Sequence, residues 1–145
     1  MKIYLRKNSR TRIVQALYAW KLSKNNFQKI KHDFNKKNTK KIDKNYFNEI
    51  FTGIVLNKKK IDLLIKPYIL KNLNRLGKIE KSILRMSFYE LLYKRDIPYK
   101  VIINEAIEIS KIFCSENSHK IINGVLDKAA FKIRKKKDKL FIMLK

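Results

Sequence analysis

The side chains that could carry out catalysis are few in this sequence and lie far apart. Its two histidines are His32 and His119, and its one cysteine is Cys114. Nucleophilic attack, proton transfer and zinc binding each need several such groups held together, and the sequence offers no Cys-x-x-Cys pattern or histidine pair. We expect Cys114 to be a small, buried apolar group.

The acidic residues and the glycines also argue against catalysis. Glu105 and Glu108 are three residues apart, so they share one face of a helix. No third group completes an acid–base site there, and a solvated or salt-bridged surface is the better interpretation. Glycines occur only at positions 53, 77 and 124, which excludes a phosphate-binding glycine loop. The sequence therefore predicts a protein that is not an enzyme and that uses no metal or cofactor.

Basic residues are far more numerous, and their placement indicates a nucleic-acid partner. The formal net charge is +24, which favours polyanions. Much of the excess is lysine, however, and a biased genome composition could place lysine on the surface without selection for binding. Arginine is more informative, because three of the seven arginines, Arg6, Arg10 and Arg12, lie in the first twelve residues. Their forked donors suit phosphates and base edges.

Helices must position these residues. The chain has only three glycines and two prolines, and it has no alternating β-branched runs. Apolar residues at helical spacing predict helices over residues 9–23, 26–36, 43–66 with a break at 57–60, 78–94, 98–113 and 115–133. We expect an all-α, compact two-subdomain helical bundle of about seven helices. The expected divisions are residues 1–70, residues 71–134 and a basic and apolar tail, residues 135–145.

Single residues refine these boundaries. Ser9 and Asp43 are suitable helix N-caps. Pro67 is expected to end or kink its helix. Gly77 suits a helix end, and Gly124 inside the last helix predicts that another backbone packs closely against it.

The sequence also indicates where the protein works. It has no apolar run long enough for a membrane span, and its charged start argues against a signal peptide. One cysteine allows no internal disulfide, which fits a reducing compartment. We expect a cytoplasmic protein.

Four stretches of the chain resemble the NusB family most clearly, and the resemblance as a whole covers about residues 2–134. They are VQALYAWKLS (14–23), KPYILKNLNRLGKIEKSILRMSFYEL (66–91), IPYKVIINEAIEISK (97–111) and ENSHKIINGVLDKAA (116–130). None has a chemical meaning alone, but their order and spacing along one chain argue against chance agreement.

This resemblance implies a NusB-like fold and a role in transcription antitermination. Members of the family bind the boxA element of nascent RNA together with a small-subunit ribosomal protein, NusE. The pair joins an antitermination complex on RNA polymerase, notably in ribosomal RNA operons, and neither catalysis nor a metal is involved. The RNA-binding residues that the resemblance implies are Lys2, Arg6, Lys7, Arg10, Arg12, Gln15, Tyr18, Asn117, Ser118, Lys120 and Ile121.

Side-chain chemistry is compatible with these roles. Gln15 can read a base edge, and Tyr18 can stack on an unpaired base, although core packing is the competing interpretation for Tyr18. Asn117 and Ser118 could equally cap the last helix. For the ribosomal partner, the resemblance implies a surface at Asn74, Arg75, Glu80, Lys81, Leu84 and Arg85, where an ordinary solvated face is the competing interpretation.

The chain departs from the family pattern in ways that affect RNA binding. Lys7 and Asn8 stand where relatives often have arginine, which predicts looser RNA selectivity. Asn117 replaces a frequent acidic residue, which should favour RNA contact. Two alternatives stay open: a helical interaction module that has lost specific RNA recognition, and an RNA-binding subdomain of a ribosomal RNA methyltransferase. The second would need a catalytic domain after residue 134, whereas the sequence ends at residue 145.

Overall fold

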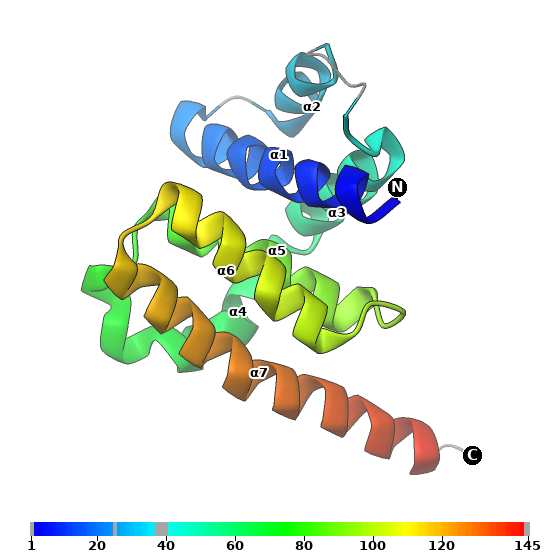
Figure 1. The fold of residues 1–145 in the computed structure, drawn as a ribbon, viewed down its shortest axis with the longest axis vertical. Helices are drawn as coiled ribbons and strands as arrows, with labels where there is room; N and C mark the ends of the chain where they lie inside the picture. Colours follow the sequence, from blue (N-terminus) through cyan, green and yellow to red (C-terminus); the bar gives the residue numbers. More distant parts are fainter. Residues whose placement is uncertain (1, 25, 37–40, 144–145) are drawn as a thin grey trace.

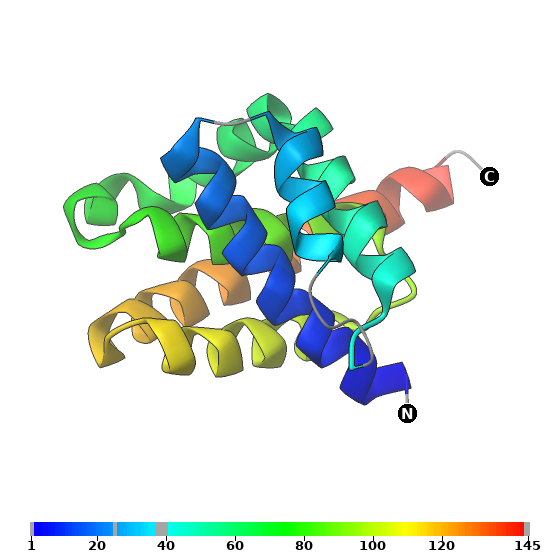
Figure 2. The ribbon, with the colours of Figure 1, turned by 90° about the horizontal axis from the view of Figure 1, so that it is seen from above.

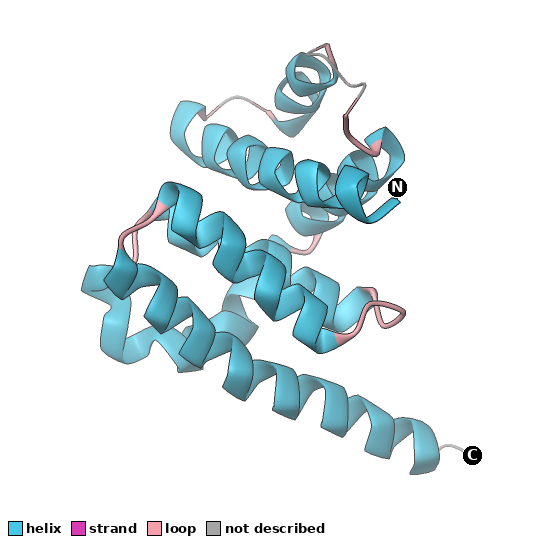
Figure 3. Ribbon diagram, viewed as in Figure 1, coloured by secondary structure: helices cyan, strands magenta, loops and turns pink. Residues whose placement is uncertain are grey.

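The computed structural model describes residues 2–24, 26–36 and 41–143, with side chains for residues 4–24, 26–36, 41–72 and 74–135. Within these ranges the chain forms seven α-helices and one short 3₁₀-helix and contains no strand (Figures 1 and 3). The elements are α1 (Lys2–Ser23), α2 (Phe27–Asn35), α3 (Lys44–Leu56), α4 (Lys58–Ile69), η1 (Leu70–Arg75), α5 (Lys78–Tyr93), α6 (Tyr99–Phe113) and α7 (Glu116–Met143). The predicted all-α class and helix number are confirmed.

Helix α5 lies at the centre of the molecule. Helices α1, α2 and α3 form one group and α4, α6 and α7 another (Figure 1), and the view from above shows α1 crossing the second group (Figure 2). Helix α5 packs against α1, α3, α4, α6 and α7, and every residue from Ser82 to Leu91 is buried. Such a helix is enclosed on all sides, so it joins both groups into one core. Because α4 packs chiefly on α5 and η1, the division of the chain at residue 70 stays a prediction.

The crossing of α3 and α5 depends on Gly53. A Cβ atom at this position would lie 2.2 Å from the hydroxyl oxygen of Tyr89 and 2.4 Å from its ring, so no larger residue fits without displacing the ring. The close approach expected at Gly124 is wrong, since nothing lies within 4 Å of the Cβ position there. The glycine that permits tight helix packing is therefore in α3 and not in α7.

Two predicted caps had different outcomes. Asp43 caps α3 as expected, because its carboxylate accepts a hydrogen bond from the backbone N–H of Tyr46 at 3.0 Å. Ser9 is not a cap, because α1 begins at Lys2 and Ser9 lies inside it. The Ser9 hydroxyl donates to the carbonyl of Leu5 and accepts from the N–H of Asp43, both at 2.8 Å. It therefore ties α1 to the start of α3.

Two boundaries differ from the expected ones. Pro67 lies inside α4, which continues to Ile69 before the chain tightens into η1. Helix α7 runs on to Met143, so most of the expected tail continues the last helix and extends away from the other helices (Figure 1). No helix in the described ranges combines the length and the apolar character that a membrane crossing requires.

Candidate nucleic-acid interface

Helix α1 presents one polar face to solvent. Tyr4, Lys7, Gln15 and Tyr18 are exposed and follow one another at spacings of three, eight and three residues, whereas Ile13 and Leu17 on the opposite face are fully buried. This spacing places the four side chains along one stripe of the helix. The stripe offers a cation, an amide and two aromatic rings in a row, which are the groups that contact phosphates and bases. Tyr18 is 36% exposed, so core packing, which was the competing interpretation, does not account for its whole side chain.

An open groove with a volume of about 540 Å³ runs beside this stripe. The Asn8 amide on one wall donates to the carbonyl of Lys41 at 2.8 Å, and Arg12 donates to the carbonyl of Phe34 at 3.3 Å. Among the residues that line the groove, the two charged ones, Arg12 and Lys41, are both basic. The lining comprises Tyr4, Asn8, Thr11, Arg12, Gln15, Lys41, Ile42 and Ile112.

Arg10 does not belong to this surface, which corrects its predicted RNA contact. Its side chain is 4% exposed, and its Nε donates to Oε2 of Glu90 at 2.9 Å. The hydroxyl of Tyr46 donates to the same carboxylate oxygen. Burial and the charge of Glu90 raise the pKa of Tyr46, so its hydroxyl stays protonated and keeps donating. Arg10 thus balances a buried charge in the core.

The remaining basic residues near the N-terminus stand on helix α1. Lys7 is exposed, and Arg6 is half-buried with its guanidinium carbon 4.7 Å from the centroid of the Tyr46 ring. A cation over an aromatic face is held in place. Lys2 begins α1, but its side chain lies outside the described residues.

The second predicted RNA patch, at the start of α7, is only partly exposed. Asn117 and Lys120 face solvent, and Nζ of Lys120 lies 3.6 Å from Oε1 of Glu116. Ile121 is half-buried against the core. Helix α6 links this patch to the groove, because Ile112 lines the groove and α7 begins soon after α6 ends.

Ser118 is the exception in this patch. It is buried, and its hydroxyl donates to Oε2 of Glu80 at 2.9 Å. Ser115 caps α7 instead, since its hydroxyl accepts from the N–H of Ser118 at 3.3 Å. A buried hydroxyl committed to Glu80 is not available to RNA, so Ser118 is corrected to a residue that joins α7 to α5.

The six residues predicted for the ribosomal partner do not share one surface. Leu84 is fully buried in the core, and Arg85 is buried with its Nε donating to Oδ1 of Asp62 at 2.8 Å. Asn74 and Arg75 are exposed on η1. Leu84 and Arg85 are therefore corrected to packing and ion-pairing residues.

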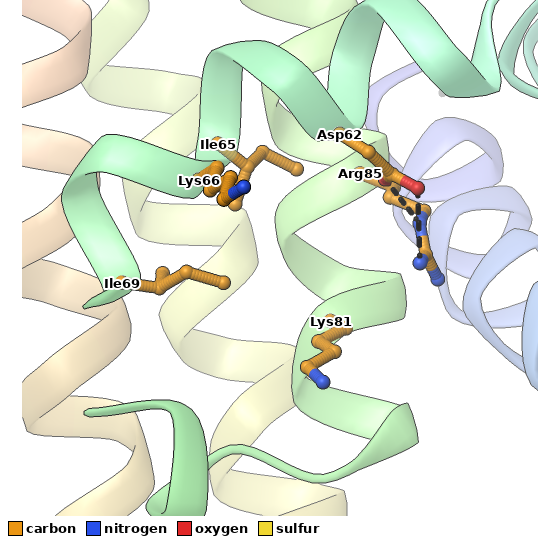
Figure 4. A pocket seen from close by; sticks show the side chains of 6 residues that line it. All are labelled: Asp62, Ile65, Lys66, Ile69, Lys81 and Arg85. Carbon is orange, nitrogen blue, oxygen red and sulfur yellow. Dashed lines mark hydrogen bonds and ion pairs between the residues drawn. The ribbon is translucent and has the colours of Figure 1, made fainter. Parts of the chain in front are cut away.

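Lys81 and the Arg85 ion pair lie beside a pocket of about 240 Å³ between α4 and α5. Figure 4 shows the Asp62–Arg85 ion pair at one end of this pocket and the ammonium group of Lys81 farther along α5. The lining residues are Asp62, Ile65, Lys66, Ile69, Lys81 and Arg85. The exposed part of the predicted partner surface is thus Asn74 and Arg75, whereas Lys81 is half-buried and the Glu80 carboxylate accepts a hydrogen bond from Ser118 on α7.

The Asp62 ion pair should make stability depend on pH. Burial alone would raise the pKa of Asp62, but the hydrogen bonds and charges of Arg85 and Lys58 outweigh it and lower that pKa. Because the pKa of Asp62 is lower in the folded state, the ion pair contributes its full stability at pH values above the pKa of the unfolded state, which is about 3.9. This contribution is lost as the pH falls through the pKa of the folded state. We expect Asp62→Asn to lower the free energy of unfolding near neutral pH and to lower it less at about pH 3.

Urea denaturation at the two pH values measures this difference. Asp127→Asn, which changes an exposed acid on α7, is the matched control. An equal loss for Asp62→Asn at both pH values would show that the carboxylate contributes nothing through its charge.

Cys114, which was expected to be buried, is only half-buried. Burial, with a smaller effect of Glu80, raises the pKa of Cys114 to about 11, so its thiol stays protonated at neutral pH. Within the described ranges, no group of three or more His, Cys, Asp or Glu side chains could hold a metal ion.

Sequence reasoning missed several residues that line the groove: Tyr4, Asn8, Thr11, Lys41, Ile42 and Ile112. Tyr4 had a detectable signal, since it continues the spacing of Thr11 and Gln15 toward the N-terminus. The expected helix start at Ser9 concealed that continuation. The others become neighbours only through the packing of α1 with the start of α3 and the end of α6.

Comparisons with known proteins agree with one another. Residues 7–131 match the model of the NusB family. A transcription antitermination protein NusB of Buchnera aphidicola subsp. Acyrthosiphon pisum is 53% identical over 134 residues, which are 92% of this chain and 94% of that protein. A structure of T. maritima NusB is similar with a TM-score of 0.75 and 35% identity, over 86% of this chain and 89% of that one. A NusB chain solved with NusE and double-stranded RNA has a TM-score of 0.73 and 25% identity, over 90% and 98% of the two chains.

Proposed function

The chain belongs to the NusB family, and from that premise we propose that it is an antitermination factor that binds boxA-type single-stranded RNA together with NusE. The family consists of transcription antitermination factors, so the chain is not an enzyme. We place its action in the cytoplasm, on ribosomal RNA transcription, where it joins the RNA polymerase complex indirectly through RNA and its ribosomal partner.

The stripe on α1 is the observation that carries the RNA proposal. Lys7 supplies a phosphate contact, Gln15 an amide for a base edge, and Tyr18 a ring for an unpaired base, all on one exposed face. Stacked rings and base-edge donors suit single strands, because bases in a duplex hide their faces. The groove beside the stripe adds Arg12 and Lys41, and the start of α7 adds Asn117, Lys120 and Ile121.

Exposure and proximity support a position for the ribosomal partner. Asn74 and Arg75 are exposed members of the surface that the family resemblance implies, and Lys81 is a half-buried one. Glu80 stands between this surface and the start of α7, where it holds Ser118. We therefore place NusE beside the second RNA patch, so that RNA contacts both proteins. In support of a joint complex with NusE and RNA, a NusB relative with 25% identity was solved with NusE and double-stranded RNA.

A binding comparison tests this proposal directly. Affinity for a boxA-type RNA and for a scrambled RNA of the same length should be measured with and without NusE. We expect NusE to raise affinity for the boxA-type RNA more than for the scrambled one. No gain on adding NusE, with equal binding to both RNAs, would instead favour an interaction module that has lost specific RNA recognition.

Lys7→Ala combined with Arg12→Ala should flatten the salt dependence of RNA binding. Each phosphate contact on a single strand contributes about 0.7 to the slope of log K against log salt concentration, so losing two should reduce the slope by about 1.4. Fluorescence anisotropy titrations at several salt concentrations measure the slope. Lys44→Ala with Lys100→Ala, two exposed lysines on α3 and α6, is the matched control. Equal slopes for the two double variants would place the phosphate contacts elsewhere.

A further inference from the structure

A second groove lies between α4 and α7, and its lining is mostly apolar. Its volume is about 670 Å³, and two of its leucines, Leu63 and Leu70, are 70% and 55% exposed. Large aliphatic side chains that stand together at one hollow mark a binding surface more often than scattered ones do. The lining residues are Leu63, Leu64, Pro67, Tyr68, Leu70, Lys71, Asn72, Lys128 and Lys132.

The charge at the rim of this groove has one sign. Lys71, Lys128 and Lys132 are its charged lining residues, and the lining contains no acid. The ammonium group of Lys132 lies 5.9 Å from the centroid of the Tyr68 ring, which packs edge-on against Phe88. The groove is thus an apolar floor with a basic rim.

The groove extends along α7 past Gly124. A shallower hollow of about 170 Å³ shares Tyr68, Asn72 and Lys128 with it and reaches Lys120. Nothing lies within 4 Å of the Cβ position of Gly124, so no part of the described chain fills this place. From Lys120 to Lys132, α7 rises about 18 Å, which equals about three turns of a helix.

We propose that this groove receives an acidic amphipathic helix of a protein partner. Three turns present apolar side chains at positions i, i+4 and i+7, which fit a floor made by Leu63, Tyr68 and Leu70. Glu or Asp on the flanks of such a helix meets Lys128 and Lys132, which gives the interface its polarity and orientation. The lining of the larger groove shares no residue with the stripe on α1, with the RNA patch at the start of α7 or with Asn74 and Arg75. The smaller hollow shares Lys120 and Ile121 with the RNA patch at the start of α7.

The lining fits this occupant better than the two others that the groove could take. Strands of RNA bind on exposed rings, and the larger groove offers one ring, Tyr68, among leucines and a proline. A second copy of the chain would bring another net charge of +24 against the same lysines, and repulsion between like charges opposes such a dimer.

The test uses a fluorescently labelled helical peptide of about 14 residues, with leucines at i, i+4 and i+7 and glutamates on the flanks. We expect Leu63→Ser with Leu70→Ser to weaken its binding to the full chain by about tenfold or more. The control is Leu22→Ser with Leu56→Ser, because these leucines are 54% and 71% exposed and lie outside the groove. Both pairs are exposed, so both variants should unfold at the wild-type urea concentration.

Charge is tested in the same assay. Lys128→Gln with Lys132→Gln should weaken binding of the peptide by about three- to tenfold, whereas Lys44→Gln with Lys100→Gln should leave it unchanged. Equal effects of groove and control variants would overturn the proposal.

Two further results would also overturn it. One is displacement of the peptide by a boxA-type RNA whose own affinity falls with Leu63→Ser and Leu70→Ser, because that would assign the groove to RNA. The other is a wild-type dimer, seen by sedimentation, that the same two substitutions dissociate. If the wild-type chain binds the peptide but does not bind the boxA-type RNA, the result contradicts the proposed function and leaves the groove proposal standing.

Discussion

Replacing Arg10 by methionine is expected to lower the free energy of unfolding by about 3–5 kcal/mol, because it leaves a buried carboxylate without its cation. Glu90 is fully buried, and its charge is balanced by Arg10 at 2.9 Å and by the hydroxyl of Tyr46. Methionine keeps most of the volume of arginine, so the loss would come from charge and not from a cavity. Urea denaturation followed by circular dichroism measures it.

The deficit of this variant should depend on pH. Burial raises the pKa of Glu90, and Arg10 opposes that shift, so removing Arg10 should raise the pKa further. A raised folded-state pKa means that the folded protein takes up the proton more readily, and the deficit should shrink as the pH falls from about 7 toward 5.

Two variants separate the possible causes. Lys7→Met on the same helix changes an exposed cation and should alter stability by less than about 0.5 kcal/mol. Adding Glu90→Gln to Arg10→Met should restore part of the loss, because the amide carries no charge. If Arg10→Met were as stable as the wild type but bound RNA more weakly, Arg10 would have to be an RNA-binding residue.

The largest effect on binding is expected from Gln15→Ala combined with Tyr18→Ala. Stacking on one aromatic ring contributes about 1–3 kcal/mol per base, so we expect RNA affinity to fall by about 10- to 100-fold at constant salt. Both side chains are exposed, and the free energy of unfolding should therefore stay near that of the wild type.

Leu22→Ala is the matched control, since Leu22 is exposed one turn farther along α1. It should leave RNA affinity unchanged. An equal loss for Leu22→Ala and for the double variant would mean that the effect comes from the end of α1 as a whole and not from the amide and the ring.

Local signals predicted the helices well wherever a cap and an apolar period agreed. Asp43 marked the start of α3, and the helix expected over residues 98–113 is α6, which begins at Tyr99. Ser9 misled the prediction because a serine hydroxyl can also bond back to the carbonyl four residues earlier, which is what it does with Leu5. The unbroken continuation of α7 past residue 133 was not predicted, because the lysine-rich sequence there lacks the apolar spacing of a packed helix.

The candidate site was harder to predict, because family resemblance assigns positions and not exposure. Arg10 and its buried partner Glu90 are separated by 80 residues in sequence, so no local pattern could pair them. Arg85 and Ser118 are further cases, since their partners Asp62 and Glu80 lie on other helices. The exposed residues Lys7, Gln15 and Tyr18 were accessible to sequence reasoning because an amphipathic helix reveals its own polar face.

The central position of α5 has a consequence for how the chain folds. Because α5 packs against α1 and α3 on one side and α4, α6 and α7 on the other, neither group can complete its apolar packing before α5 is in place. We therefore expect the contacts of α5 to form in the folding transition state, because both helix groups need them. The molecule should gain and lose its structure as a single cooperative unit.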